Sequence, residues 1–205
     1  MEPSDNLSTT NTPVVIIKKT FWDDVREWIQ VIVIALLISL PIRFFIAEPF
    51  IVNGASMDPT FATGQFLIVD RLTYRLEAPS RGDVIVFEYP NNPSTYYIKR
   101  IIGLPGETLD IKDGTITISN PSSTSTIPNN QTVLKEPYVK SIHRSYDTFH
   151  TNLGPTEYFV MGDNRAESSD SRLWGPLDKH YIVGRPIVRL LPITTMSILP
   201  GEYNQ

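Results

Sequence analysis

The chain has 205 residues, a formal net charge of -4 and no cysteine. This length allows one folded domain with an additional short segment, and 41% hydrophobic residues is ordinary for a protein with a packed core. An acidic chain lacks the basic surface that neutralises phosphates, so nucleic acid is not an expected partner. Without cysteine the chain forms no disulfide and no thiolate metal site.

The N-terminal region divides into a polar tail and an apolar segment. Residues 1–20 begin with a run rich in Ser, Thr, Asn and Pro, and we expect them to form a disordered tail. Residues 21–48 combine an amphipathic lead-in with an apolar stretch from Ile29 to Ala47, whose nineteen residues would span about 28 Å as a helix. We predict a single transmembrane helix here. A buried core helix is the alternative, because the strictly charge-free run is shorter.

Charges around this segment predict its orientation. Lys18, Lys19 and Arg26 precede the most apolar part, which favours a cytoplasmic N-terminus under the positive-inside rule. The acidic residues that precede the segment are unlike the basic start of a cleavable signal, so we expect an uncleaved anchor. Residues 49–205 would then form an extracytoplasmic domain, and a bacterial cytoplasmic membrane is the expected location.

From Phe50 onward the pattern changes to short β-branched and aromatic runs separated by Gly, Pro, Asn and Asp, which is typical of antiparallel β structure. The fold class is therefore predicted to be mainly β. The expected strands are Gln65–Asp70, Asp83–Tyr89, Tyr96–Ile102, Tyr158–Met161 and Ile182–Leu191. Within the last of these, Pro186 predicts an edge position or a bulge.

A hairpin is expected where two alternating runs flank Asp113-Gly114, a pair suited to the positive φ angles of a type I′ turn. The flanking runs are 109–112 and 115–118. Residues 119–150 begin with a polar Ser/Thr/Asn/Pro stretch, which we interpret as a small variable insertion in the β domain.

A first motif, Gly54-Ala55-Ser56-Met57-Asp58-Pro59-Thr60, contains a candidate nucleophile. A bend in this motif would expose the Ser56 hydroxyl and direct its amide toward a developing oxyanion, and Gly54 would allow an unusual backbone angle. Met57 would supply a flexible apolar contact in the core or toward lipid and substrate. A plain turn around Pro59 is the alternative explanation of the motif.

A second motif from Tyr97 to Glu107 contains Lys99, a candidate general base. A serine hydroxyl needs a neighbouring base, and lysine can act as one when its amine is neutral. This requires the pKa of the lysine to fall by roughly three units, and desolvation is large enough to lower it so far. Strand alternation places Lys99 on one face with Tyr97 and Ile101, and Arg100 on the other. A solvated Lys-Arg pair on an exposed strand is the alternative.

A third motif runs from Met161-Gly162-Asp163-Asn164-Arg165 to Ser168-Ser169-Asp170-Ser171-Arg172. Ser168 is the residue to which we assign a direct role, because its hydroxyl could hydrogen-bond and orient the Lys99 amine. Asp170 could pair with Arg172 or Arg100. A polar loop closed by salt bridges would explain the same pattern.

A Ser-His-Asp triad is the competing arrangement, and it would have to use His143, His150 or His180. None of the three lies in a dense motif. Surface or hydrogen-bonded structural roles are therefore expected for all three histidines.

These motifs, in this order behind an apolar segment, resemble the bacterial type I signal peptidases (leader peptidases), a family of serine proteases with a Ser/Lys dyad. The resemblance implies two antiparallel β sheets, with Ser56 as nucleophile and Lys99 as general base and later acid. It further implies that Ser168 positions Lys99, that Asp170, Arg172 and Arg100 support the site, and that Gly54 and Met57 lie in the substrate or oxyanion region.

The resemblance also implies a membrane-bound serine endopeptidase that takes part in protein secretion. It would cleave signal peptides from exported preproteins after Ala-x-Ala sites through an acyl-enzyme, with preproteins and the lipid bilayer as partners and with no metal or cofactor. Two positions depart from the family pattern. Gly54 stands where some relatives carry a serine that helps the oxyanion hole, and Ala166-Glu167 stand where Asp-Asn is usual.

Two other interpretations remain open from the sequence. A self-cleaving repressor shares the Ser/Lys dyad and the β fold, but it predicts an N-terminal DNA-binding helix pair instead of an apolar span. An anchored β domain that only binds partners predicts that replacing Ser56 or Lys99 leaves function intact.

Overall fold

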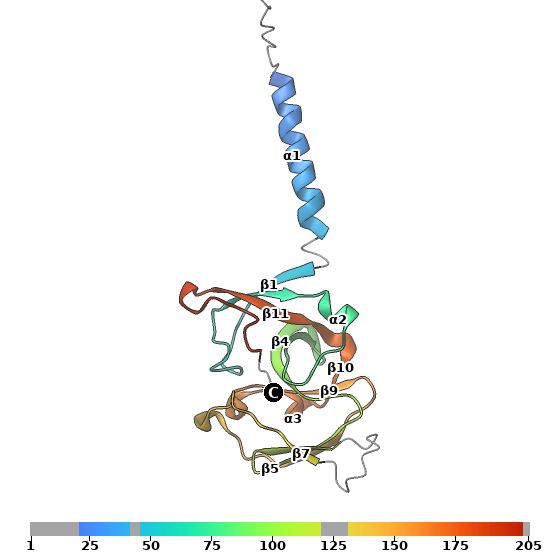
Figure 1. Cartoon of the computed structure of the whole chain (residues 1–205), viewed down its shortest axis with the longest axis vertical. Helices are drawn as coiled ribbons and strands as arrows, with labels where there is room; N and C mark the ends of the chain where they lie inside the picture. The colour runs from blue at the N-terminus through green and yellow to red at the C-terminus, as the bar shows by residue number, and fades with distance from the viewer. Residues whose placement is uncertain (1–20, 42–45, 120–130, 203–205) are drawn as a thin grey trace, which may run out of the picture. The chain divides into compact units, whose positions relative to one another are not determined.

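The computed structural model describes residues 21–41, 46–119 and 131–202 (Figure 1). The tail expected at residues 1–20 lies outside the described residues, as does part of the insertion expected near 119–150. The chain forms two compact units, Met1–Leu40 and Pro41–Gln205. The first unit contributes one helix and the second contains all the described strands.

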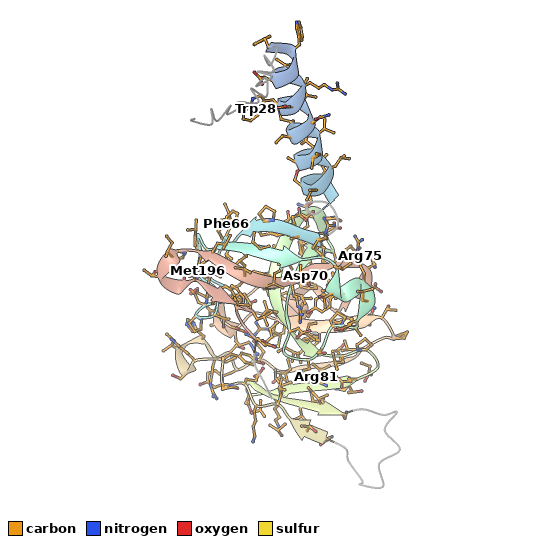
Figure 2. All side chains as sticks on the ribbon, turned by 45° about the horizontal axis from the view of Figure 1, so that its top comes forward. Trp28, Phe66, Asp70, Arg75, Arg81 and Met196 are labelled. Carbon is orange, nitrogen blue, oxygen red and sulfur yellow. The ribbon has the colours of Figure 1, made fainter. Side chains whose placement is uncertain are left out.

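Helix α1 (Phe21–Pro41) consists mainly of Ile, Val and Leu from Ile29 onward, and it has no internal glycine or proline to interrupt it. Its large apolar side chains are exposed, and Figure 2 shows side chains, Trp28 among them, projecting from the helix on several sides. Within the described residues, no helix combines the length and apolar character needed to cross a membrane. The helix was expected to reach residue 48, but Ala47 and Glu48 already pair with strand β2.

The larger sheet has eight antiparallel strands in the order β1-β2-β11-β3-β4-β9-β10, with β12 paired to β11. Its strands are β1 (Ala47–Ile51), β2 (Phe66–Asp70), β3 (Val84–Tyr89), β4 (Asn92–Gly103), β9 (Glu157–Met161), β10 (Leu177–Asp178), β11 (Ile182–Leu191) and β12 (Ser197–Ile198). The expected β-rich antiparallel architecture is confirmed, and the five predicted strands all occur at or near their expected bounds.

The smaller sheet has four antiparallel strands in the order β7-β6-β5-β8 and lies apart from β1 and β11 in Figure 1. Its strands are β5 (Thr108–Lys112), β6 (Thr115–Ser119), β7 (Gln131–Val133) and β8 (Phe149–Asn152). Asp113 and Gly114 both have positive φ between β5 and β6, and Lys112 pairs with Thr115. The predicted hairpin is therefore confirmed, with the turn chemistry that its sequence indicated.

Strand β11 contains Pro186, for which an edge position or a bulge was expected, and the structure shows the bulge. The strand lies between β2 and β3, so it is not at an edge of the sheet. The pairing of β11 with β2 shifts register between Pro186 and Val188. A bulge of this kind accommodates a residue that has no N–H to donate, even within the interior of a sheet.

Short helical turns connect the strands. They are α2 (Thr73–Leu76), α3 (Ser171–Trp174) and the 3₁₀ turns η2 (Ser141–His143), η3 (Arg165–Glu167), η4 (Lys179–Tyr181) and η5 (Ile193–Thr195). The two turns η3 and α3 fall within the third motif, so its polar sequence folds as a compact pair of turns directly after strand β9.

Three hydrophobic clusters hold the sheets and loops together. One joins residues of β4 and β9, such as Phe159, to residues of β5 and β6, such as Leu109, and so links the two sheets. A second lies on β3, β4 and β9. The third contains Met57, Phe61 and Leu67, and it packs beneath the loop that carries Ser56. This last cluster anchors the loop of the first motif on the larger sheet.

Candidate active site

Ser56 lies in the loop between β1 and β2, which we name the nucleophile loop and define as residues 54–60. The loop closes on itself, because the Asp58 N–H donates to the Ala55 carbonyl at 3.1 Å. Directly after it, the Phe61 N–H donates to the Met57 carbonyl at 2.9 Å. Ser56 is half-buried while the neighbouring Met57 is only 1% exposed. The bend therefore buries one side chain and leaves the serine at the surface of the domain.

Lys99 lies on β4, where its backbone pairs with Ile85 of β3. Its side chain is buried, and its Nζ lies 2.8 Å from Ser56 Oγ and 3.0 Å from the Ile98 carbonyl oxygen. The same Nζ is 5.1 Å from the centroid of the Tyr97 ring. The fold thus brings together two residues that are 43 positions apart in sequence, at hydrogen-bonding distance.

Burial lowers the pKa of Lys99 from its ordinary value of 10.5 to about 8. Desolvation is the largest cause, because it disfavours the charged ammonium. The carboxylates of Asp170 and Asp163 act in the opposite direction and keep the pKa from falling further. A substantial fraction of Lys99 is therefore neutral in mildly alkaline solution, as a general base requires.

A cleft of about 300 Å³ opens in front of this pair. Its walls come from the end of β1, residues 52–56, the middle of β4 and the third motif, with one residue each from β2 and β3. The residues that line it are Phe50, Ile51, Val52, Asn53, Gly54, Ala55, Ser56, Leu67, Val86, Tyr96, Tyr97, Ile98, Lys99, Glu167 and Ser169. The cleft is mostly apolar, and it could accept an extended peptide between two strand segments.

Asp170 is fully buried and organises the third motif around itself. Its carboxylate accepts from the Gly162 N–H at 3.1 Å, and from Arg172 through the backbone N–H and two guanidinium nitrogens. Arg172 also donates to the Arg165 carbonyl oxygen and to Asp147. The pairing of Asp170 with Arg172, rather than with Arg100, is thereby decided.

Arg100 points to the opposite face of β4 from Lys99, as strand alternation predicted. It forms two parallel hydrogen bonds to Asp163, of 2.8 and 2.7 Å, and donates to the carbonyl oxygens of Gly82 and Gly201. Both charged side chains are at most 1% exposed. A buried pair with this many hydrogen bonds fixes β4 relative to the third motif.

The hydrogen bond expected between Ser168 and Lys99 is absent, which corrects the prediction. Ser168 Oγ is buried and has no hydrogen-bond partner among the described residues. It lies beside Gly162, where a Cβ on that glycine would stand only 2.3 Å from it. The reason is that the Lys99 amine is directed to Ser56 and to the Ile98 carbonyl instead.

The two residues expected in the substrate or oxyanion region have different positions. Gly54 lines the cleft and has a φ of +104°, which a residue with a side chain rarely adopts. Met57 does not line the cleft and packs in the core with Phe61 and Leu67, because the bend of the loop turns it inward. Of the two places expected for Met57, the structure therefore shows the one in the core, and not the one toward the substrate.

Residues 60, 163 and 164 form contacts that the sequence did not reveal. Asp163 accepts from Thr60 as well as from Arg100, and Asn164 donates to the nucleophile loop. The burial of Arg100 is what requires a counterion such as Asp163, and this burial is seen only in the structure. For Asn164 the sequence offered no signal beyond its place in a turn.

The three histidines do not line the cleft. His150 is exposed and pairs with Asp110, and His180 is exposed and pairs with Asp178. Within the described part of the chain, no cluster of His, Asp and Glu is arranged to hold a metal ion. The surroundings of Ser56 in this structure thus offer lysine, and not histidine, as a neighbouring base.

Comparison with known proteins connects this geometry to a family. Residues 25–191 match the family model described as signal peptidase, peptidase S26. The chain belongs to this family. It is 37% identical over 197 residues to "Signal peptidase I T" of Bacillus subtilis (strain 168), covering 91% of this chain and 95% of the relative. It is also 32% identical over 190 residues to "Probable signal peptidase I-1" of Synechocystis, covering 89% and 90%.

A solved structure also matches, a signal peptidase I from Enterococcus faecalis V583 that is 29% identical. The match covers 53% of this chain and 97% of that one, with a TM-score of 0.43.

Family membership decides between the interpretations that the sequence left open. A member of the signal peptidase family is a serine endopeptidase, which is a hydrolase, and the family processes signal peptides. The interpretations as a self-cleaving repressor and as a domain that only binds partners are therefore set aside. The resemblance inferred from the three motifs is confirmed.

Proposed function

We propose that this peptidase cleaves signal peptides from preproteins after Ala-x-Ala sites, with Ser56 as nucleophile and Lys99 as general base. The observation that carries the proposal is the 2.8 Å contact between Lys99 Nζ and Ser56 Oγ beside an open cleft. Burial supports it, because the pKa of Lys99 is lowered to about 8 and its amine is partly neutral. Asp170, Arg172 and Arg100 support the site as structural residues.

The proposed reaction has two halves. In the first, Ser56 Oγ attacks the scissile carbonyl carbon while Lys99 takes the hydroxyl proton, and the carbonyl oxygen becomes an oxyanion. Lys99 then gives this proton to the leaving amine, which becomes the N-terminus of the mature protein. In the second half, Lys99 takes a proton from water, and the resulting hydroxide attacks the acyl-enzyme. The signal peptide leaves with a new carboxylate and Ser56 regains its proton.

The cleft supports recognition of an extended substrate. Its walls include the end of β1 near Phe50 and the middle of β4 near Tyr96, so the backbone of a peptide could pair beside strand segments. Small substrate residues such as alanine would suit shallow pockets between these walls. We expect the developing oxyanion to accept from the Ser56 N–H, which makes no hydrogen bond to the described residues.

A direct test is cleavage of a purified preprotein with an Ala-x-Ala signal by the full chain in detergent. The parent should cut after the second alanine, and Ser56→Ala and Lys99→Met should abolish cutting while remaining folded. Lys112→Met and Ser119→Ala are matched controls, since both residues lie on the smaller sheet outside the cleft. Cutting by Lys99→Met at the parent rate would refute the assignment of the base.

We further propose that α1 and the residues after it anchor the chain in the bacterial cytoplasmic membrane, with the N-terminus cytoplasmic. The support is the row of exposed apolar side chains along α1 from Ile29 to Leu40. Alkaline carbonate extraction of cells that make the full chain should leave it in the membrane pellet. External protease should digest residues 49–205 in spheroplasts. Recovery of the chain in the carbonate supernatant would refute the anchor.

A further inference from the structure

Asn164 of the third motif forms a two-point clamp on the nucleophile loop. Its backbone N–H donates to the Ser56 carbonyl oxygen at 3.0 Å. Its side-chain Nδ2 donates to the Ala55 carbonyl oxygen at 3.2 Å. Asn164 itself is only 3% exposed. We propose that Asn164 is a positioning residue whose side-chain amide orients and polarises the peptide unit that stabilises the oxyanion.

The Asn164 side chain holds the peptide unit that carries the Ser56 N–H. The Ala55 carbonyl and the Ser56 N–H belong to the same peptide unit, which is not among the cis peptide bonds of the chain. In a trans peptide the C=O and the N–H point in opposite directions within one plane. A donor fixed on the Ala55 carbonyl therefore fixes the direction of the Ser56 N–H on the other side of that plane.

Polarisation of this peptide unit also strengthens the hydrogen bond that the Ser56 N–H can give to the oxyanion. The Ala55 carbonyl accepts from Asp58 N–H as well as from Asn164. Hydrogen bonds in a chain polarise one another, so donors on the carbonyl oxygen make the N–H of the same unit a stronger donor. The Ser56 N–H makes no hydrogen bond within the described residues, so it is available to an oxyanion.

Two glycines explain why the Ser56 amide depends on its contact with Asn164. Gly54 offers no side-chain hydroxyl to the oxyanion, so the Ser56 amide carries more of the stabilisation. Gly162 allows the close approach of the two loops, since a Cβ there would stand 2.3 Å from the Ser56 carbonyl oxygen. The third motif can therefore reach the backbone around the nucleophile directly.

The side-chain oxygen of Asn164, Oδ1, also supports a functional role for this residue. Asn164 Oδ1 is buried without a hydrogen-bond partner, which is unfavourable for folding. Rotating the amide by half a turn would place Oδ1 against the Ala55 carbonyl oxygen and lose the donor. The side chain is thus retained in an orientation that favours the Ala55 contact at the expense of its own oxygen.

The competing explanation is that Asn164 only ties the two loops together. Thr60 provides a matched control, because its hydroxyl joins the same loop to Asp163 of the third motif without touching the peptide unit between Ala55 and Ser56. A simple tether would give similar results at both positions. A residue that positions the oxyanion donor would affect turnover far more than the tether does.

The experiment compares Asn164→Ala, Asn164→Leu and Thr60→Val in the full detergent-solubilised chain. Leucine has nearly the shape of asparagine and removes both the donor and the unpartnered Oδ1, so this variant should keep or raise the thermal midpoint. Both Asn164 variants should lower kcat by about 10- to 100-fold and change KM by less than about threefold. Thr60→Val should lower the thermal midpoint and change kcat by less than about threefold.

A peptide aldehyde ending in Ala-x-Ala supplies a readout that a tether would not change. It forms a tetrahedral adduct with a serine nucleophile, so its affinity should weaken by the same factor as kcat in the Asn164 variants. Binding of an uncleavable substrate peptide should stay unchanged. Equal losses of kcat in the Thr60 and Asn164 variants, an unchanged aldehyde affinity, or a failure of both Asn164 variants to fold would overturn the inference.

The inference rests on the proposed function, and the two can fail separately. If Ser56→Ala still cleaves the preprotein at the parent rate, the proposed nucleophile is wrong. If Ser56→Ala is inactive and Asn164→Leu cleaves at the parent rate, the nucleophile stands and only the positioning role is refuted.

Discussion

Replacing Lys99 by methionine should stabilise the protein while it abolishes catalysis. Lys99 is 4% exposed, and its pKa is lowered from 10.5 to about 8 because burial disfavours the ammonium. The unfolded chain therefore binds the proton more tightly than the folded chain does. At pH 7 this difference destabilises the folded state by about 3 kcal/mol, and methionine removes the penalty.

The sign of the pH dependence follows from the lowered pKa. Below pH 8 the lysine is protonated in both states and the penalty is complete. Between pH 8 and 10.5 only the unfolded state holds the proton, so the stability of the parent rises with pH. The advantage of Lys99→Met should therefore shrink from about 3 kcal/mol at pH 7 to about 1 kcal/mol at pH 10.

Urea unfolding of the full chain in detergent, followed by tryptophan fluorescence at pH 7, 8, 9 and 10, measures this difference. Lys112→Met is the control, because Lys112 is exposed on β5 and its replacement removes no buried charge. Contributions from all other titrating groups cancel between parent and variant. A difference between Lys99→Met and the parent that is constant from pH 7 to 10 would refute the reasoning.

Three further outcomes are expected. As pH increases, the kcat/KM of the parent should rise through an apparent pKa near 8 that belongs to Lys99. In Asp170→Asn this rise should move to lower pH, because Asp170 raises the pKa of Lys99. A profile unmoved by Asp170→Asn would contradict this. Arg100→Lys breaks the paired bonds to Asp163 and should cost about 3 kcal/mol, lowering the thermal midpoint by about 6 to 12 °C in calorimetry. Gly54→Ser should lower the free energy of unfolding in urea by about 1 to 3 kcal/mol, because a serine would be strained at a φ of +104°. A steric clash does not contribute, since no atom lies within 4 Å of a Cβ there. An unchanged urea midpoint would contradict the expected backbone strain.

Local patterns in the sequence were sufficient for much of the fold. Short runs of β-branched and aromatic residues predicted β3, β4 and β11, and Asp113-Gly114 predicted the hairpin of β5 and β6. These features depend on neighbouring residues and on turn geometry. The position of β11 between β2 and β3 was not predicted, because strand order depends on contacts between residues that are far apart in sequence.

The site was predicted in its residues but not in all of its contacts. Motif and strand alternation were enough to select Ser56 and Lys99, which the fold brings to 2.8 Å. The positions of Ser168 and Met57 depended on how the loops bend, which no local pattern specifies. The bond from Asn164 to the nucleophile loop joins residues 109 positions apart and could be found only in the structure.

The central place of β11 has a consequence for how the domain is made in the cell. Because β11 (Ile182–Leu191) lies between β2 and β3, a growing chain carries two unpaired strand edges until β11 has left the ribosome. Arg100 completes its hydrogen bonds only when the Gly201 carbonyl arrives. The larger sheet therefore cannot be completed before β11 and Gly201 are available, so its folding is delayed until these residues have been made.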